Sequence, residues 1–276
     1  MSARLVDLHS HVLPGVDDGA RDIDEALSAL EALSADGVER VVATPHFRAS
    51  LFERGRAAAR LARFDEAYDS LVEAAGERGL SIEIGRGCEF KLDAPSFDLS
   101  DPRLRLDGTR YALVEFASFQ LPPFGGNQLA SVREAGWVPV LAHPERYAGM
   151  ERALDQVGRW VGEGVLLQVN ARSLIGFYGA RARRTALELL TRGWVCCLAS
   201  DYHSTGDPQW LEALRSLVRD SGLDDVVGER GGDPVDPGAV SWIRELSHGN
   251  PRRLLEDGTP RAVGARRLDP GGAGRV

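Results

Sequence analysis

Residues 7–19 read DLHSHVLPGVDDG. This stretch ends an apolar run with two histidines one residue apart and continues into a loop with two adjacent aspartates. Six further β-rich runs follow along the chain, and most of them also end in histidine or acidic side chains. The seven runs are RLVDLHSH (4–11), RVVATPHF (40–47), LSIEIGRGCEF (80–90), RYALVEF (110–116), WVPVLAHPERY (137–147), VLLQVNARSL (165–174) and WVCCLASDYH (194–203).

Stretches with helical spacing of apolar residues separate most of these runs. They cover residues 22–35, 53–79, 127–136, 153–164, 181–193 and 208–222, whereas residues 92–108 connect two runs as a loop. Strands that alternate with helices predict an α/β fold with a parallel sheet, because parallel strands need crossover connections. Seven such strands in one domain favour a closed barrel, and a doubly wound open sheet is the alternative.

The chain reads as one domain followed by a short tail. No linker rich in Pro, Gly or Ser divides residues 1–258, and a last helical segment at 240–255 is expected to cover one side. Residues 259–276 contain few apolar side chains and many Gly, Pro and Arg, so we expect this tail to be disordered.

Composition excludes several classes of protein. The formal net charge of −8 argues against a dedicated nucleic-acid binder, which needs a basic surface. No apolar run is long enough for a transmembrane segment, and the start MSARLVDLHSH does not resemble a signal peptide. Three cysteines, two of them adjacent, make a poor disulfide framework. These features predict a cytoplasmic protein.

Histidines and acids gather where the strands end. In a parallel α/β fold the carboxyl ends of the strands form one rim, on which chemistry is assembled. Each residue taken alone has an ordinary explanation, as a capping or core-edge group. Their joint placement on one rim is best explained by divalent metals, and the carboxylates could bridge more than one ion. The residues concerned are His9, His11, Asp17, Asp18, His46, Glu89, Glu115, His143, Asp201 and His203.

The same residues carry a resemblance to a known family. In order, HxH, LPGVDDG, ATPHF, GCEF, LVEF, AHPERY, QVNARSL and ASDYH resemble the PHP (polymerase and histidinol phosphatase) family, and more closely its CpsB/YwqE-type bacterial protein-tyrosine phosphatases. The resemblance covers about residues 5–255 and implies a distorted (β/α)7 barrel, the PHP fold, with the metal site at the carboxyl ends of the strands. It also implies a role in capsule or exopolysaccharide regulation, with a phosphotyrosyl protein such as a bacterial tyrosine kinase as the partner.

The resemblance implies a cluster of three metal ions. Manganese is the usual metal of the family, while histidine and carboxylate ligands also suit iron or zinc. Asp17 is expected to lie outside the ligand set, and Arg146 matches the family arginine that contacts the substrate phosphate. The implied ligands are His9, His11, Glu89 and Asp201 for the first ion, Glu89, Glu115 and His143 for the second, and Asp18, His46 and His203 for the third.

Two departures from the family pattern concern the outer pocket. The family commonly has ATPHH, and here the second histidine is Phe47. The family also tends to have an arginine soon after SDAH, and here SDYHSTGDPQW contains none. Its replacement is left open among Arg48, Arg172 and Arg181. Asn170 could bind substrate, or it could be a satisfied polar group at a strand end.

The chemistry predicted from this set is phosphate-ester hydrolysis. A metal can activate water to hydroxide near neutral pH, and a second metal with Arg146 would bind the phosphoryl oxygens. The alternatives are a small-molecule phosphatase, such as one for histidinol phosphate, and a non-catalytic metal-binding regulatory protein. An amidohydrolase is less favoured, because the sole lysine, Lys91, lies beyond Glu89. A cysteine-dependent phosphatase is disfavoured because no arginine stands six positions after any cysteine.

Overall fold

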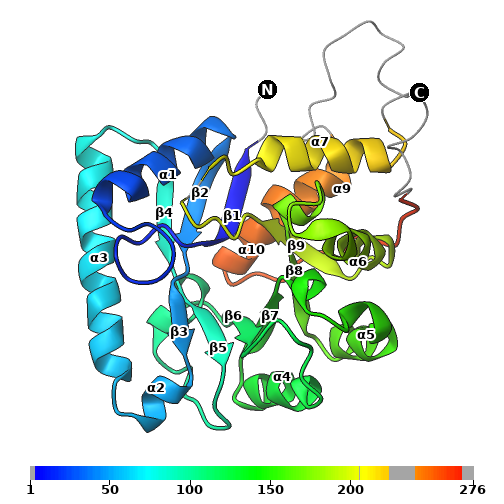
Figure 1. Ribbon diagram of the computed structural model, residues 1–276, viewed down its shortest axis with the longest axis horizontal. Helices are drawn as coiled ribbons and strands as arrows, with labels where there is room; N and C mark the ends of the chain where they lie inside the picture. The colour runs from blue at the N-terminus through cyan, green and yellow to red at the C-terminus, as the bar shows by residue number, and fades with distance from the viewer. Residues whose placement is uncertain (1–3, 205, 224–239, 269–276) are drawn as a thin grey trace, which may run out of the picture.

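The computed structural model describes residues 4–204, 206–223 and 240–268. Its described strands form two parallel sheets (Figure 1). The first sheet has the order β1–β2–β4, and the second has the order β3–β5–β6–β7–β8–β9. The strands are β1 (Leu5–Ser10), β2 (Val38–Ala43), β3 (His46–Arg48), β4 (Glu83–Arg86), β5 (Glu89–Leu92), β6 (Tyr111–Phe116), β7 (Val138–Ala142), β8 (Leu166–Asn170) and β9 (Val195–Ala199).

All seven predicted runs contain strands, but two of them are interrupted. Residues 40–47 give β2 and β3, with Pro45 between them, and residues 80–90 give β4 and β5. A proline cannot donate to a strand ladder, which accounts for the first interruption. β2 pairs with β4 in the first sheet, and their continuations β3 and β5 pair in the second. The two sheets therefore share the same two chain segments.

The first and last strands also meet. Ser10 and Tyr202 form an isolated parallel bridge, and the Asp201 amide donates to the carbonyl of His9 at 2.9 Å. The parallel α/β fold is confirmed. Because the described strands form two separate ladders rather than one continuous ring, the closed seven-stranded barrel stays a prediction.

Helices separate most of the predicted strand runs, as the sequence predicts, and the helices from residue 210 onward follow β9. Figure 1 shows α1 and α3 beside the first sheet and α4, α5 and α6 beside the second. The predicted helix at 53–79 is broken after Glu53, where Gly55 has a φ of +61°. The predicted helix at 240–255 contains a π-helical turn at Glu245–Gly249. The α-helices are α1 (Ile23–Ala35), α2 (Ser50–Glu53), α3 (Ala57–Glu77), α4 (Gly125–Glu134), α5 (Leu154–Gly162), α6 (Gly179–Thr191), α7 (Trp210–Asp220), α9 (Ser241–Arg244) and α10 (Asn250–Leu255).

Two apolar clusters hold the strands in place. The larger packs helices against the sheets, and the smaller joins side chains of both sheets to α10, including Val6, Val140 and Leu254. Every residue of β1 and β6 is buried. Strands covered on both faces are typical of parallel sheets, and burying them fixes the positions of their carboxyl ends.

The segment after residue 258 packs on the domain as far as the structure describes it. Val263 and Leu268 are buried, and the Arg266 amide donates to the carbonyl of Thr191 at 2.8 Å. Residues 259–268, expected to be disordered, therefore contact the domain here, because two apolar side chains and backbone hydrogen bonds attach them. Residues 269–276 of the predicted tail lie outside the described residues, and the division of the chain at residue 258 stays a prediction.

Asn250 connects this segment to the sheet. Its fully buried side-chain Nδ2 donates to the carbonyls of Cys196 and Arg261 at 2.9 Å each, and its Oδ1 accepts from the Arg261 amide at 2.7 Å. Asn250→Ala should lower the free energy of unfolding by roughly 2–4 kcal/mol, because it leaves buried backbone groups without partners. Urea unfolding measures this loss. The exposed Asn127→Ala is the control and should change stability by less than about 0.5 kcal/mol. Equal stability of the two variants would contradict this account.

Candidate metal centre

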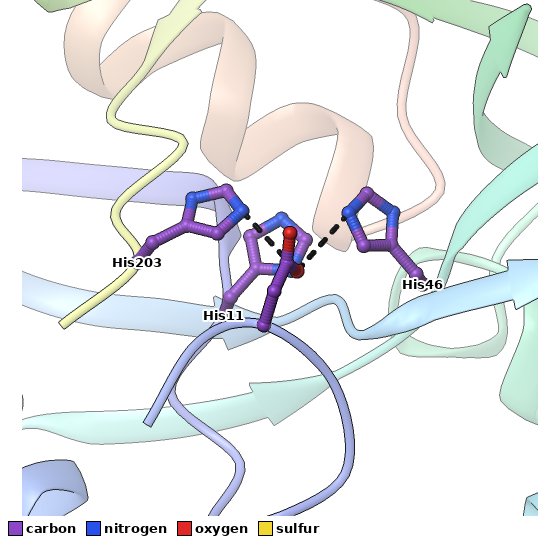
Figure 2. Close-up of side chains that lie close together, drawn as sticks. His11, His46 and His203 are labelled. Carbon is purple, nitrogen blue, oxygen red and sulfur yellow. Dashed lines mark ion pairs between the residues drawn. The ribbon is translucent and has the colours of Figure 1, made fainter. Parts of the chain in front are cut away.

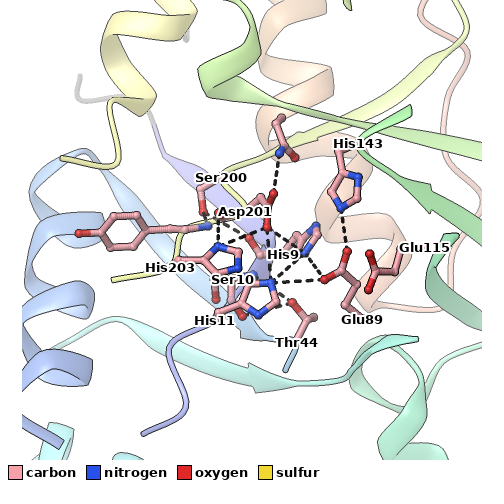
Figure 3. A network of polar contacts seen from close by, with 12 residues as sticks. His9, Ser10, His11, Thr44, Glu89, Glu115, His143, Ser200, Asp201 and His203 are labelled. Carbon is pink, nitrogen blue, oxygen red and sulfur yellow. Dashed lines mark hydrogen bonds and ion pairs between the residues drawn. The ribbon is translucent and has the colours of Figure 1, made fainter. Parts of the chain in front are cut away.

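All nine predicted ligands lie together, near the carboxyl ends of β1, β2, β4, β6, β7 and β9. Figure 3 shows most of them converging on one cluster, with Glu89 among the imidazoles. His9 lies in β1, and His11 comes directly after it. His46 follows β2 and begins β3, and Glu89 follows β4 and begins β5. Glu115 lies in β6, and His143 follows β7. Asp201 and His203 follow β9, and Asp18 comes from the loop after β1.

The ligand atoms form four overlapping groups, each small enough to surround one ion. Within each group the atoms lie within 4.8 Å of one another. The groups share members, so the site is one connected cluster. They consist of His9, His11 and Asp201; His9, Glu89 and His143; His46, Glu89 and Glu115; and His11, Asp18, His46 and His203.

Glu89 is the shared acid of the cluster. Its Oε2 lies 2.9 Å from His46 Nδ1, 3.3 Å from His9 Nε2 and 3.4 Å from His11 Nε2. Its Oε1 lies 2.8 Å from His143 Nε2. Each carboxylate oxygen thus faces a different set of imidazoles, which is the arrangement required of a bridging ligand.

A second contact brings His9 and His11 together. Their Nε2 atoms are 3.2 Å apart, and Asp201 Oδ1 lies 3.4 Å from each of them. All three side chains are buried. Two imidazole nitrogens that point at one another and at a carboxylate make a ready site for a cation.

The third part of the cluster is open to solvent. Figure 2 shows the imidazoles of His11, His46 and His203 facing a common point. Asp18, 68% exposed, lies 3.4 Å from His46 Nε2 and 3.6 Å from His203 Nε2. An exposed acid at this position leaves the cluster accessible from one side, which is where a substrate could approach.

The cluster has the electrostatics of a cation site. His46 Nδ1 is buried and lies 2.9 Å from Glu89 Oε2 and 3.1 Å from Glu115 Oε1, and Lys91 Nζ lies 3.0 Å from the same Glu115 oxygen. Burial lowers the pKa of His46, but the Glu115 and Glu89 carboxylates outweigh it and raise the pKa to about 10. A buried site that holds positive charge this strongly fits divalent metal ions.

Neighbouring side chains fix the imidazoles. His11 Nδ1 lies 2.8 Å from Asp17 Oδ2, and His9 Nδ1 lies 3.0 Å from Gln168 Oε1. Burial raises the pKa of Asp17, but the His11 contacts and backbone donors outweigh it and hold the pKa well below its usual range. Asp17 therefore lies outside the ligand groups and orients a ligand, as the sequence resemblance implies.

The backbone at two predicted ligands is strained. His143 has a φ of +36° and Asp201 a φ of +53°, both in the left-handed region that non-glycine residues seldom adopt. His143 comes directly after β7, and Asp201 lies two residues after the end of β9. Such strain persists where surrounding structure fixes it, and it is common at functional sites.

Asn170 has a different position from the one expected for a substrate contact. It is fully buried, and its Nδ2 donates to Asp201 Oδ2 at 2.7 Å while its Oδ1 accepts from Gln168 Nε2 at 2.9 Å. Both ends of the amide are thus engaged within the protein. Gln168 is the residue that the sequence reading missed, although a polar side chain two positions before Asn170 in an apolar strand was a signal.

Arg146 lies beside the cluster. Its Nη1 donates to Asp201 Oδ2 at 2.5 Å, and its guanidinium carbon lies 4.3 Å from the ring centres of both Phe119 and Tyr178. Two aromatic faces hold a guanidinium in place while its remaining donors stay available. Neither aromatic residue had been identified as part of the site.

Phe47 belongs to the apolar core and not to the pocket. It is fully buried, and its ring stacks on Phe90 with centroids 5.8 Å apart and also contacts Phe52 and Phe64. The departure from ATPHH therefore strengthens packing behind the site and removes no group from the ligand set described above.

The three arginines considered as replacements for the missing family arginine lie in different places. Arg181 donates to the carbonyls of Arg146 at 2.9 Å and Tyr147 at 3.0 Å, so it supports the loop that carries Arg146. Arg48 is exposed at the end of β3. Arg172 is buried directly after β8.

The fold and the cluster define an α/β protein with a centre suited to divalent metals at the carboxyl ends of its parallel strands. Comparison with known families identifies it further. The family described as "Capsular polysaccharide synthesis, CpsB/CapC" matches residues 5–227, and the chain belongs to this family. Among the residues that the structure describes, no helix combines the length and the apolar character needed to cross a membrane.

Known proteins of similar sequence carry tyrosine-phosphatase names. The chain is 28% identical to tyrosine-protein phosphatase YwqE of Bacillus subtilis, covering 79% of this chain and 85% of that protein. It is 26% identical to tyrosine-protein phosphatase CpsB of Streptococcus pneumoniae, covering 92% and 99%. Among solved structures, a chain from the work on YwqE and CpsB, described as "unique metal-dependent tyrosine phosphatases", superposes with a TM-score of 0.77. It is 24% identical, and the match covers 96% of this chain and 100% of that one, which shows the common fold.

Gly19 tests how the loop after β1 positions His11. A Cβ added at Gly19 would lie 2.0 Å from the His11 carbonyl oxygen and 2.5 Å from its Cβ, so Gly19→Ala must displace the loop or His11. We expect Mn²⁺ affinity to fall roughly 10–100-fold, as for other changes that misorient a ligand. Isothermal titration with Mn²⁺ measures this.

Gly76→Ala is the matched control for that variant. Gly76 lies in α3 with open space around it, so the added methyl group should leave Mn²⁺ affinity unchanged and raise helix stability by about 0.5–1 kcal/mol. If Gly19→Ala binds Mn²⁺ with the same affinity as the unaltered protein, the loop does not position His11.

Proposed function

We propose that this protein is a metal-dependent phosphoric monoester hydrolase that acts on phosphotyrosine in proteins. The observation that carries the proposal is the cluster of five imidazoles and four carboxylates, Glu89 among them, with the guanidinium of Arg146 beside it. Phosphoryl transfer needs charge neutralisation and a positioned nucleophile, and this arrangement supplies groups for both. The tyrosine-phosphatase names of the relatives support the choice of substrate.

The proposed ions are three, with manganese the first choice and iron or zinc the alternatives. His9, His11, Glu89 and Asp201 would hold the first, Glu89, Glu115 and His143 the second, and Asp18, His46 and His203 the third. The ions would supply a nucleophile from water near neutral pH and neutralise the phosphoryl oxygens. We also propose that the two sheets together form the distorted (β/α)7 barrel of the PHP family, because β1 and β9 meet at Ser10 and Tyr202.

The protein's own residues would bind and orient the substrate. Arg146 would donate to the phosphoryl oxygens, since one of its nitrogens is fixed on Asp201 and its plane is held between Phe119 and Tyr178. Phe119 is 48% exposed, so part of its ring is free to contact the aromatic ring of a substrate. An aryl phosphate has a good leaving group, with a phenol pKa near 10, and therefore needs little proton donation.

The biological setting is part of the proposal. Family membership in capsular polysaccharide synthesis supports a role in capsule or exopolysaccharide regulation, with a phosphotyrosyl protein such as a tyrosine kinase as the substrate. We place the activity in the cytoplasm, where the three buried free cysteines would stay reduced.

The direct test is phosphate release with Mn²⁺ from a phosphotyrosyl peptide and, in parallel, from histidinol phosphate. We expect turnover of the peptide, and its loss in His11→Ala, which removes a buried member of two ligand groups and controls for contaminating phosphatases. Preference for histidinol phosphate would instead assign the protein to small-molecule chemistry. Absence of hydrolysis of either substrate by the metal-loaded protein would contradict the proposed function.

Arg146→Lys separates phosphate binding from metal binding. Lysine keeps the charge but loses both the planar stacking and the fork of donors. We expect kcat/KM for the phosphotyrosyl peptide to fall roughly 100-fold, while Mn²⁺ content stays the same, because Arg146 contacts Asp201 Oδ2 and not the oxygen that faces the histidines. Arg184→Lys, at an exposed position of α6, is the control. Unchanged kcat/KM in Arg146→Lys would remove Arg146 from the mechanism.

A further inference from the structure

Arg172 is a largely buried cation that lies against an aromatic ring and pairs with no acid among the described residues. The residue is 8% exposed, and its guanidinium makes no hydrogen bond or ion pair with any residue that the structure describes. Its Nε is completely buried. An unpaired buried charge is unfavourable, and in folded proteins such groups are normally paired with an acid or a ligand. The two Nη atoms of Arg172 are not fully buried, so they are available to an anion that approaches from solvent.

A row of stacked side chains connects Arg172 to the metal centre. The Arg172 guanidinium carbon lies 3.3 Å from the ring centre of Phe177, whose ring meets Tyr178 edge to face at 5.0 Å. Tyr178 in turn covers Arg146 at 4.3 Å, and Arg146 donates to Asp201. Two guanidiniums thus lie on neighbouring aromatic residues, one at the cluster and one farther from it.

The backbone also places Arg172 on the same rim. It lies in the 3₁₀ turn Ala171–Ser173, directly after β8 and two residues beyond Asn170, which contacts Asp201. Arg172 therefore lies at the same ends of the strands as the cluster.

The surface around this row is unusually aromatic. Among the described residues four large apolar side chains are exposed, and Phe119 and Phe177, 48% and 54% exposed, belong to this row. Exposed aromatic side chains beside arginines suit a ligand that combines apolar and anionic groups, such as an extended peptide with acidic residues.

We propose that Arg172 binds a second oxyanion of the substrate, next to the phosphoryl group that is held at the metal centre. This inference rests on the proposed phosphatase function and adds to it a preference for phosphotyrosines with an anionic neighbour. The second oxyanion is a carboxylate of a flanking acidic residue or the phosphoryl group of a second phosphotyrosine. Each of these groups has two oxygens that can accept a pair of hydrogen bonds from a guanidinium. Arg172 would thereby partly replace the arginine that the family tends to have soon after its SDAH motif and that is absent after His203 in this chain.

The test compares kcat/KM for three phosphotyrosyl peptides of one length. One has glutamates beside the phosphotyrosine, one has alanines there, and one has a second phosphotyrosine. The unaltered protein should prefer one or both anionic peptides over the alanine peptide by about tenfold, as expected for a charge-assisted hydrogen bond. Arg172→Gln should abolish that preference, and Arg172→Lys should keep part of it. Arg184→Gln, which removes an exposed arginine of α6, should leave the ratio unchanged.

The pattern across peptides identifies the anion. Loss of preference for both anionic peptides would show that any oxyanion is accepted, and loss for the doubly phosphorylated peptide alone would show that a phosphoryl group is required. An equal fall of kcat/KM on all three peptides in Arg172→Gln would overturn the proposal and indicate a structural role.

The two proposals fail in distinguishable ways. Hydrolysis of none of the peptides by the unaltered protein would contradict the phosphatase function itself. Hydrolysis of all three with the same kcat/KM would leave the phosphatase function standing and overturn the role of Arg172.

Discussion

The carboxylate of Glu89, buried among imidazoles, is the constraint on which the site depends. Its two oxygens lie within 3.4 Å of His9, His11, His46 and His143, which come from the ends of three different strands. Burial alone raises the pKa of a carboxylic acid, yet the imidazoles around Glu89 hold its pKa well below the usual range. The negative charge of Glu89 is thus stabilised only if positive charge lies close to it. The fold places imidazoles and further carboxylates, which bind cations, around this acid.

This requirement explains features that are unfavourable for stability. Left-handed backbone at His143 and Asp201, and the burial of the Glu89 and Glu115 carboxylates next to each other, would each destabilise a fold that had no ligand. A divalent cation would stabilise the buried carboxylates together, because each group of ligand atoms is small enough to surround one ion. The strain and the buried carboxylates are therefore interpreted as the consequence of a binding site, with the aromatic residues around Arg146 and Arg172 beside it.

Much of this arrangement could be predicted from the sequence, because parallel strands end at a common edge. Alternating runs predicted every strand segment, and the polar residue after each run predicted which side chains would meet, from His9 to His203. Asp17 was also expected beside the ligands. One sequence could not predict contacts between segments at this edge of the sheets. Phe119 and Tyr178, which contact Arg146, come from connecting segments with no polar pattern, and Gln168 lies within an apolar strand. Asn170 was predicted from its position alone, and the structure places both ends of its amide within the protein.

The measurement that tests the central claim most directly is anomalous X-ray diffraction, at the manganese absorption edge, from crystals soaked in Mn²⁺. The account predicts strong peaks among His9, His11, His46, Glu89, Glu115, His143, Asp201 and His203, with Glu89 in contact with two of the ions. Peaks elsewhere on the protein, or an empty cluster at saturating Mn²⁺, would contradict it.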